Sequence, residues 1–383
     1  MIPYGKQNVT DDDINAVTSV LKSDFLTQGP VVPKFEDSIS KYVGSSYAIA
    51  TNSATSALHI ACLSLGLTKG DILWTSPNSF VASSNCGLYC GATVDFVDID
   101  LDTYNICLDA LEEKLINCKE KNTLPKILVP VHLSGQSCDM KRIKSLSNEY
   151  GFKIIEDASH AIGGKYEGLP IGNCKYSDIC IFSFHPVKII TTGEGGMATT
   201  NDKGLADKLE LFRSHGITRN RDFMHKDLGP WYYEQLVLGF NYRMTDIQAA
   251  LGYSQLSRIE SIIKKRHEIA ERYNEILREL PLILPYQTSS SYSSFHLYII
   301  RLKLNKINKS YLEVFKSLKD KGIGVNLHYI PIHTHPFYKS LGFNSGDFPN
   351  SERFASEAIS IPMYPNLTNQ LQDEVVEALI SSI

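Results

Sequence analysis

The first two hundred residues alternate between two hydrophobic patterns. Short apolar runs typical of buried strands are separated by longer segments in which apolar residues recur every three or four positions, as on one face of a helix. The predicted strands lie at 47–53, 71–76, 92–99, 126–133, 152–159, 179–184 and 195–200, and the predicted helices at 11–24, 32–44, 54–67, 79–91, 109–118 and 139–150. Such alternation predicts an α/β fold with a mostly parallel sheet covered by helices on both faces.

The pattern changes near Thr245. One helical pattern of more than 30 residues runs from there until Pro281 and Pro285 stop it. A strand at 295–302, a helix at 309–322, a second strand at 323–330 and a final helix at 368–383 complete a small α/β unit. We therefore expect a large domain at 1–250 and a small C-terminal domain at 251–383, with the boundary inside the long helix.

Composition narrows the class of protein. The net charge is −4 and 43% of the residues are hydrophobic, so nothing favours electrostatic binding to nucleic acid or to an anionic membrane. The first twenty residues are too polar for a signal peptide, and no apolar run reaches transmembrane length. Eight cysteines without a C-x-x-C pair predict buried reduced thiols, with neither a zinc site nor disulfides. We expect a soluble cytoplasmic protein.

One lysine, Lys188, stands alone among apolar and small residues in "IFSFHPVKIITTGEGGMATT". Desolvation lowers the pKa of such an amine, and a neutral amine is a nucleophile that condenses with aldehydes. Asp157 ends the predicted strand at 152–159, where a carboxylate needs a cationic partner. A protonated pyridine nitrogen would serve, and the pair suits pyridoxal phosphate. Taken alone, Lys188 also fits a solvated loop and Asp157 also fits a cap of the next turn.

Three further features point to the same ligand. In "TNSATSALH" (51–59), small residues at a strand-to-helix turn leave backbone N–H groups of Ser53, Ala54 and Thr55 free to cradle a phosphate. The alternative is an ordinary helix cap. Phe80 follows another strand and is either a ring that stacks on a planar cofactor or a core residue. Ser183, five residues before the lysine, offers a hydroxyl to the phosphate.

The order of these features resembles one family, the DegT/DnrJ/EryC1/StrS sugar aminotransferases. The likeness covers nearly the whole chain and rests on "FLTQGP" (25–30), "TNSATSALH", "EDASHAIG" (156–163), "SFHPVK" (183–188), "TTGEGG" (191–196), "FRSHG" (212–216), "GFNYRMTDIQAALG" (239–252) and "HLYIIR" (296–301). It implies a fold type I transferase that depends on pyridoxal 5'-phosphate. Within the family, "GPWYYEQLVLGFNYRMTDIQ" (229–248) and "VNLHYIPIHTHPFYKSLGF" (325–343) are most like the pseudaminic acid branch.

The resemblance also implies roles. Lys188 would hold the cofactor and shuttle the proton, Asp157 would pair with the ring nitrogen, and His160 would lie near the ring oxygen. Asn241 would reach the phosphate in the neighbouring subunit, which gives a homodimer with shared active sites. The implied cofactor-binding residues are Ser53, Ala54, Thr55, Phe80, Asp157, His160, Ser183, Lys188 and Asn241. The implied substrate-binding residues are Tyr4, Asp24, Phe25, Leu26, Thr27, Ala54, Ser183, Asn241, Asn326, Leu327, His328 and Tyr329.

The implied reaction moves an amino group from L-glutamate to C4 of a UDP-linked 4-keto-6-deoxy-N-acetylhexosamine of the L-arabino configuration. Several alternatives stay open from sequence. Asn241 also fits a turn cap, Tyr4 and His328 also fit packing positions, and Arg213 and Arg243 fit either anion contacts or ordinary ion pairs. The sugar is either this one or another keto sugar, such as a perosamine precursor or a D-configured sugar.

Other classes fit the sequence less well. The 3-dehydratase branch of the family has histidine where this chain has Lys188. A non-catalytic member of the fold does not need Asp157, Ser183 and Lys188 together. A nicotinamide-binding dehydrogenase needs a G-x-G-x-x-G turn after its first strand, whereas this strand ends in "TNSATS".

Overall fold

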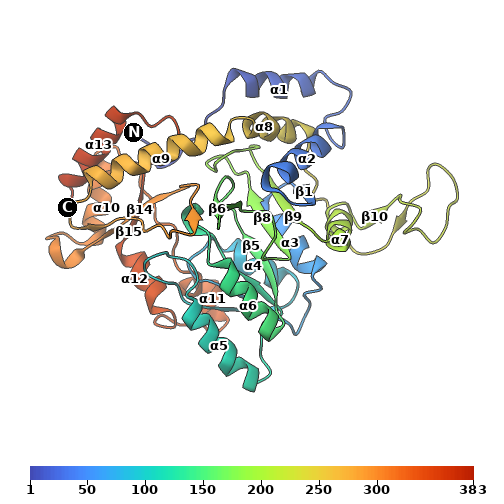
Figure 1. Cartoon of the computed structure of the whole chain (residues 1–383), viewed down its shortest axis with the longest axis horizontal. Coiled ribbons are helices and arrows are strands. Elements are labelled where there is room, and N and C mark those ends of the chain that lie inside the picture. The colour runs from blue at the N-terminus through green and yellow to red at the C-terminus, as the bar shows by residue number, and fades with distance from the viewer.

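The computed structural model describes all 383 residues and builds them around a seven-stranded sheet (Figure 1). In spatial order the strands are β1 (Tyr47–Thr51), β9 (Gly196–Thr200), β8 (Ile179–Ser183), β5 (Lys153–Asp157), β4 (Ile127–Val129), β2 (Ile72–Thr75) and β3 (Thr93–Phe96). β9 runs antiparallel to both of its neighbours, and every other pair in the sheet is parallel. The predicted mostly parallel sheet is confirmed.

Helices cover both faces of this sheet, as predicted. One face is covered by α3 (Ala54–Ser64), α4 (Ala82–Tyr89) and α7 (Lys203–Arg213). The other face is covered by α2 (Val31–Val43), α8 (Asp246–Leu256), α5 (Leu108–Glu120) and α6 (Met140–Tyr150). Successive side chains of a strand point to opposite faces, so Ile154 packs under α6 whereas Ile155 packs under α3 and α4. The two faces therefore bury separate apolar cores.

A smaller α/β unit follows the large sheet in sequence. Its antiparallel sheet consists of β12 (Leu282–Ile283), β14 (Tyr298–Leu302) and β15 (Ala358–Ile361), and its helices are α9 (Ile259–Ile276), α10 (Tyr311–Asp320) and α13 (Asn369–Ile380). Figure 1 shows α9 running from the end of α8 toward α13. Ile2, near the N-terminus, packs into the hydrophobic core of this smaller unit. The division at residue 250 stays a prediction.

The predicted single helix from Thr245 is wrong in one respect. It divides into α8 and α9, because Arg258 leaves helical geometry at a φ of −108° and ψ of 5°. Its guanidinium donates to the Asp13 carboxylate at 2.6 Å, and Ser254 donates its hydroxyl to the same carboxylate at 2.7 Å. Asp13 is fully buried and belongs to α1 (Asp11–Leu21). The break between α8 and α9 is therefore accompanied by contacts to Asp13, which lies more than 240 residues away in sequence.

The predicted strand at 323–330 is also wrong. Only isolated bridges form there, from Ile323 to Ile2 and from Asn326 to Ser360, because the segment turns so that its side chains line a cavity. The third strand of the small sheet is β15, which the hydrophobic pattern did not single out. Short elements complete the fold: β6 (Lys165–Tyr166), β7 (Leu169–Pro170), β10 (Ile217–Thr218), β11 (Glu234–Gln235), β13 (Ser291–Tyr292), α11 (Pro336–Ser340) and α12 (Pro349–Glu357). Figure 1 shows the β10–β11 hairpin projecting from the body.

All eight cysteines are free thiols, but not all are buried as predicted. Cys90, Cys107 and Cys118 are partly exposed because they lie near the ends of surface helices. No helix combines the length and the apolar character needed to cross a membrane.

The join between the two units contains a buried cation. Arg266, on α9, is 1% exposed, and its Nη1 donates to the carbonyl oxygens of Phe295 (2.9 Å), His296 (3.2 Å) and Met363 (3.2 Å). No carboxylate pairs with it, and burial lowers its pKa to about 9. The guanidinium is thus solvated by backbone carbonyls that lead into and out of the small sheet.

We expect the substitution Arg266→Leu to lower the free energy of unfolding by roughly 3 kcal/mol, since three buried carbonyls lose their donor. Urea unfolding followed by circular dichroism measures the change. Arg278→Leu is the control, because Arg278 lies just beyond α9 and is exposed, so its effect should stay within about 0.5 kcal/mol. Equal unfolding midpoints for the two variants would contradict this account.

Candidate active site

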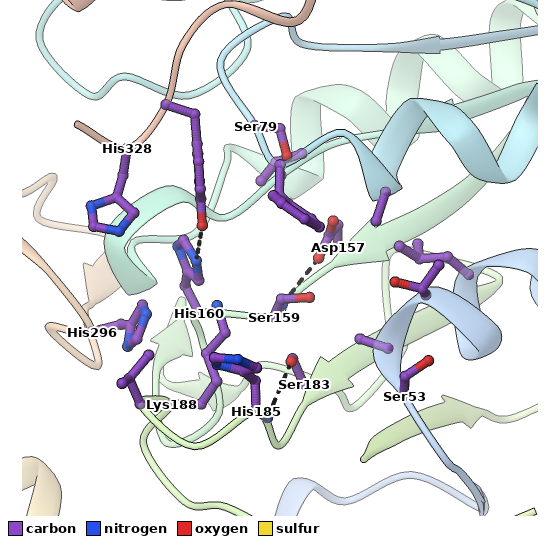
Figure 2. Close-up of a pocket in the computed structure, with 18 of the residues that line it drawn as sticks. Ser53, Ser79, Asp157, Ser159, His160, Ser183, His185, Lys188, His296 and His328 are labelled. Carbon is purple, nitrogen blue, oxygen red and sulfur yellow. Dashed lines mark hydrogen bonds between the residues drawn. The ribbon is translucent and has the colours of Figure 1, made fainter. Parts of the chain in front are cut away.

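A cavity of about 470 Å³ opens where the carboxyl ends of β5 and β8 face the start of α3 (Figure 2). Ligands of parallel α/β sheets bind at this edge. Residues from both ends of the chain meet here, because Tyr4 and the segment 326–329 line the same cavity as the strand ends. The predicted residues that line it are Tyr4, Ser53, Ala54, Thr55, Phe80, Asp157, His160, Ser183, Lys188, Asn326, His328 and Tyr329.

Asp157 ends β5 and is held by two hydrogen bonds. The Ser83 hydroxyl donates to its Oδ2 at 2.6 Å, and the Ser159 backbone N–H donates to its Oδ1 at 3.1 Å. Asp157 is 5% exposed and lines the cavity, and its carboxylate is bonded to Ser83 and Ser159 rather than to an arginine or lysine. It can therefore accept a further charged donor from a bound ligand.

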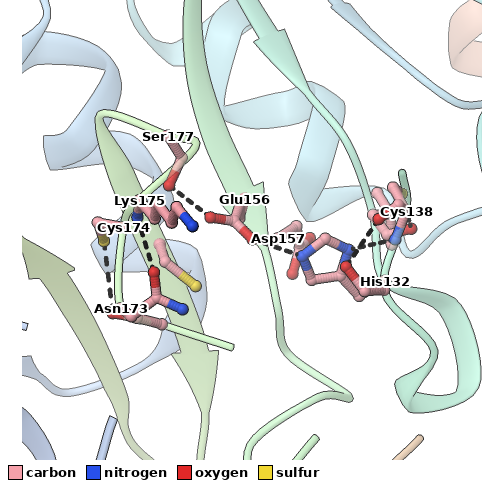
Figure 3. A network of polar contacts seen from close by, with 12 residues as sticks. His132, Cys138, Glu156, Asp157, Asn173, Cys174, Lys175 and Ser177 are labelled. Atoms are coloured by element: carbon pink, nitrogen blue, oxygen red, sulfur yellow. Dashed lines mark hydrogen bonds and ion pairs between the residues drawn. The ribbon is translucent and has the colours of Figure 1, made fainter. Parts of the chain in front are cut away.

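The face of β5 opposite the cavity carries a second carboxylate, Glu156 (Figure 3). It accepts hydrogen bonds from His132 Nε2 at 2.7 Å and from the Ser177 hydroxyl. His132 Nδ1 accepts the Cys138 backbone N–H at 3.1 Å, which leaves Nε2 to donate its proton to Glu156. The His132 backbone N–H also donates to the Asp157 carbonyl oxygen at 3.0 Å. These hydrogen bonds hold the carboxyl end of β5 in place on the side that faces away from the cavity.

Lys188 lies in the turn after β8, and its backbone N–H donates to the His185 carbonyl oxygen at 2.9 Å. Burial lowers the pKa of its amine to about 8, although the Asp157 carboxylate opposes the change. At pH 7 roughly one amine in ten is then neutral, against fewer than about one in a thousand for a solvated lysine. The side chain is thus prepared to act as a nucleophile and as a base.

The turn before α3 is free to hold an anion. The Ser53 hydroxyl accepts the Ser56 backbone N–H at 3.1 Å, so Ser53 caps the helix as the alternative interpretation had it. The N–H groups of Ala54 and Thr55 make no hydrogen bond within the chain. Gly196 allows this turn to lie against β9, because a Cβ there would come within 2.5 Å of the Ala54 nitrogen. The cradle therefore has two free donors at a helix N-terminus.

Phe80 and Ser183 complete the part of the cavity near Asp157. Phe80 is 58% exposed, which excludes the core alternative, and its ring lies 6.1 Å from the ring of Tyr329. The Ser183 hydroxyl accepts the His185 N–H at a long 3.5 Å, so it can also donate into the cavity. An aromatic face, a carboxylate, an amine and an anion cradle therefore surround one space.

Three histidines enclose the other side of the cavity: His160, His296 and His328. Burial lowers the pKa of all three imidazoles, and the Lys188 charge adds to this effect. For His328 the pKa falls to about 3. These rings are therefore neutral at physiological pH and act as hydrogen-bonding groups rather than as charges.

Sequence reasoning missed several residues of the cavity. They are Leu58, Ser79, Ala82, Val131, Ser159, His185, Val187, Glu194 and His296. His296 had a signal, since it heads the strand motif "HLYIIR", and its buried Nδ1 has no hydrogen-bond partner. A polar atom left unpaired in this way is characteristic of a site completed by a ligand.

Some predicted residues lie outside the cavity of the single chain. They are Asp24, Phe25, Leu26, Thr27, Asn241 and Leu327. Leu327 packs against the core between the two units, whereas Phe25, Leu26 and Asn241 are exposed. Arg213 donates to Glu36 and to the Ala50 carbonyl, so an ordinary ion pair accounts for it. Arg243 makes no ion pair. The ligand contacts of residues 24–27 and Asn241 stay predictions.

This arrangement fits pyridoxal phosphate. The two free N–H groups of the α3 turn and Ser183 would hold its phosphate, Asp157 its ring nitrogen, Phe80 its ring face and Lys188 its aldehyde carbon. The fit depends on observations independent of any likeness, namely the unpaired donors at Ala54 and Thr55 and the single amine opposite Asp157.

Comparison with known proteins gives the same answer. The model of the DegT/DnrJ/EryC1/StrS aminotransferase family matches residues 7–380. A UDP-4-amino-4,6-dideoxy-N-acetyl-beta-L-altrosamine transaminase of Campylobacter jejuni is 38% identical over 382 residues, which cover 100% of this chain and 97% of that protein. The Bacillus subtilis spore coat polysaccharide biosynthesis protein SpsC is 37% identical over 381 residues, 99% of this chain and 96% of that protein.

Solved structures agree with this. Helicobacter pylori PseC, an aminotransferase involved in the biosynthesis of pseudoaminic acid, is 32% identical with a TM-score of 0.90, covering 100% of this chain and 98% of that one. Sugar aminotransferase Spr1654 of Streptococcus pneumoniae, described as putative and solved in its PLP form, is 28% identical with a TM-score of 0.88, covering 100% and 98% of the two chains. The chain belongs to the DegT/DnrJ/EryC1/StrS aminotransferase family and is a nucleotide-sugar aminotransferase of fold type I that depends on pyridoxal phosphate.

Proposed function

We propose that this enzyme transfers an amino group from L-glutamate to C4 of a UDP-linked 4-keto-6-deoxy-N-acetylhexosamine of the L-arabino configuration. The product is UDP-4-amino-4,6-dideoxy-N-acetyl-β-L-altrosamine, a precursor of pseudaminic acid. The observation that carries the proposal is the 38% identity, over the full chain, to the Campylobacter jejuni transaminase named for this product. The likeness to PseC supports the same pathway.

The residues of the cavity divide the work of such a reaction. Pyridoxal phosphate, when bound, supplies an aldehyde that condenses with amines and a ring that draws electrons from the neighbouring carbon. Asp157 would hold a positive charge at the ring nitrogen, and Phe80 would cover the ring and exclude water. Lys188, whose pKa is lowered, would act as a base that takes the proton from the substrate carbon and returns it one position away.

The same cavity would serve both substrates in turn. Glutamate would give up its amino group and leave as 2-oxoglutarate, and the keto sugar would then take the amino group up at C4 while Lys188 moves protons in the opposite sense. We infer that Tyr4, Asn326 and His328 contact the sugar nucleotide, because they line the cavity on the side where the imidazoles are neutral. Uncharged donors and acceptors suit hydroxyl and acetamido groups better than fixed charges do.

One observation supports an alternative sugar substrate. SpsC, named for spore coat polysaccharide, is 37% identical to this chain, nearly the same as the transaminase of Campylobacter jejuni. Another keto sugar is therefore the alternative substrate, and the amino-transfer chemistry at Lys188 would be unchanged.

We also propose a homodimer in which Asn241 completes the neighbouring site. Asn241 is exposed beside the α3 turn, where its carbonyl oxygen faces the Asn52 amide at 3.5 Å, yet it does not line the cavity of its own chain. Phe25 and Leu26, in the motif "FLTQGP", are apolar side chains that are 54% and 45% exposed. A partner covering this surface would bury the apolar side chains.

Replacing Lys188 by arginine should lower amino transfer by about a thousandfold or more, because a guanidinium neither condenses with the cofactor nor accepts a proton at neutral pH. Single-turnover assays measure the rate, and the purified variant should lack the yellow colour of the wild type. The exposed Lys175→Arg is the matched control and should behave as wild type. Substantial turnover by Lys188→Arg would defeat the assigned role.

The substrate assignment is tested by incubating the enzyme with L-glutamate and either of two UDP-linked 4-keto-6-deoxy-N-acetylhexosamines, of the L-arabino or the D-xylo configuration. NMR of the product reports its stereochemistry. We expect amino transfer to the L-arabino sugar at a kcat/KM at least roughly tenfold above that for the other, the difference that a few sugar contacts supply. Preference for the D-configured sugar would replace the proposed substrate by the alternative.

The shared site predicts complementation between two inactive variants. Lys188→Arg lacks the amine, and Asn241→Asp places a negative charge beside the neighbour's phosphate. After mixing, unfolding and refolding together, about half of the dimers carry one of each, and one of their two sites contains both natural residues. We expect recovery of about a quarter of wild-type activity. A mixture no more active than its separate components would mean that Asn241 serves its own subunit.

A further inference from the structure

A chain of hydrogen bonds with a fixed direction ends at a tyrosine in the cavity. The Ser134 backbone N–H donates to His160 Nδ1 at 3.2 Å, and His160 Nε2 lies 3.1 Å from the Tyr329 hydroxyl. A backbone amide can only donate, so Nδ1 carries no proton and the neutral imidazole must bear its proton on Nε2. His160 therefore donates to Tyr329, and the Tyr329 hydroxyl proton is free to be donated elsewhere.

The backbone that fixes the direction of these hydrogen bonds adopts an unfavourable conformation. Ser134 adopts a φ of +59°, a left-handed conformation that is uncommon outside glycine and is often found at functional sites. The Ser294 hydroxyl donates to the His160 carbonyl oxygen at 2.6 Å, which fixes the same histidine from the other side. The His296 ring lies 4.4 Å from the His160 ring and prevents it from tilting away.

Tyr329 itself lines the cavity together with Lys188 and Asp157. Its backbone N–H donates to Asn78 Oδ1 at 3.1 Å, and its ring lies 6.1 Å from the ring of Phe80. Burial raises the pKa of its hydroxyl, and the negative charges of Asp157 and of an ionised Tyr4 would raise it further. The hydroxyl therefore keeps its proton, and no atom of the chain accepts it.

The position of the hydroxyl selects its acceptor. Figure 2 shows His160 beside Lys188 and across the cavity from Ser53, which belongs to the phosphate cradle. In pyridoxal phosphate the ring hydroxyl is attached next to the aldehyde carbon and away from the phosphate arm. An aldehyde carbon at Lys188 and a phosphate at the α3 turn would bring that oxygen to the side of His160 and Tyr329.

We propose that Tyr329 is the hydrogen-bond donor to the ring oxygen of the cofactor, and that Ser134 and His160 are positioning residues that impose the direction of this bond. Because His160 donates its only ring N–H to Tyr329, it would contact the cofactor with the face or edge of its ring and not as a hydrogen-bond donor. This assignment depends on cofactor binding alone and is independent of which sugar is the substrate.

The bond has a measurable consequence for the cofactor-loaded protein. At low pH a proton held at the Lys188 nitrogen would satisfy the ring oxygen of the bound cofactor. At high pH that proton is lost, and the oxygen depends on Tyr329. A donor to this oxygen therefore favours the deprotonated form and lowers the pH at which the visible absorbance changes.

The experiment is a pH titration of the visible absorbance of the loaded protein. Tyr329→Phe should raise the midpoint by about one pH unit, a tenfold change in proton affinity, as expected for one hydrogen bond to a charged oxygen. His160→Phe, which releases Tyr329 from its fixed direction, should shift the midpoint the same way by less. Tyr4→Phe is the matched control, because Tyr4 lines the cavity without a hydrogen bond to His160, and it should leave the midpoint unchanged.

Thermal unfolding of each variant shows that it is folded, and the His160 variant carries the test if the Tyr329 variant is not. The other charged and titratable residues that line the cavity, namely Asp157, His185, Lys188, Glu194, His296 and His328, are the same in every variant. The proposal is overturned if neither Tyr329→Phe nor His160→Phe moves the midpoint, or if Tyr4→Phe moves it as far. Absence of amino transfer from glutamate would refute the proposed function and leave this result standing.

Discussion

The structure depends on the parallel pairing of β5 with β8. Their register sets Asp157 opposite Ile181, so the two strands deliver a carboxylate and the turn that carries Lys188 to the same edge of the sheet. Both groups are removed from water there, and each is costly to bury alone. The opposite charges of Asp157 and Lys188 stabilise each other, and the ring nitrogen and aldehyde of the cofactor would take the place of this mutual support on binding. Because Asp157 and Lys188 are charged partners only of each other, both remain available to a ligand that carries a protonated nitrogen and an aldehyde.

The local parts of this arrangement could be predicted from the sequence. Strands of the large sheet and the helices between them follow from hydrophobic periodicity, which depends on neighbours within a few residues. The lysine, the aspartate and the small-residue turn each lie at the end of such a strand, so topology alone brings them together. Phe80 shows where this prediction ends. Its sequence position is compatible with a core residue or with a stacking ring, and only the structure shows that it is exposed to the cavity.

The parts that could not be predicted depend on distant contacts. Nothing near Arg258 announces a break in a helical pattern, since the carboxylate that accompanies it belongs to Asp13. The segment 323–330 has the composition of a strand, yet it bends so that Asn326 and His328 reach the cavity. Residues 24–27 and Asn241 illustrate another limit of local patterns. They are exposed in the single chain, and a side chain proposed to meet a second subunit looks the same in sequence as one that meets water.

The charge distribution suits the proposed use of one lysine as nucleophile and as proton carrier. Lys188 is the only cation among the residues that line the cavity, and the phosphate cradle consists of backbone N–H groups and hydroxyls. A lysine or arginine in the cradle would bind phosphate more strongly, but its charge would oppose protonation of the ring nitrogen at Asp157 and of Lys188 itself. Since proton transfer requires Lys188 to gain and lose a proton near neutral pH, neutral donors are the better phosphate ligands here. The three neutral imidazoles follow the same constraint, because each added positive charge near Lys188 would lower its pKa below the range in which it can return the proton.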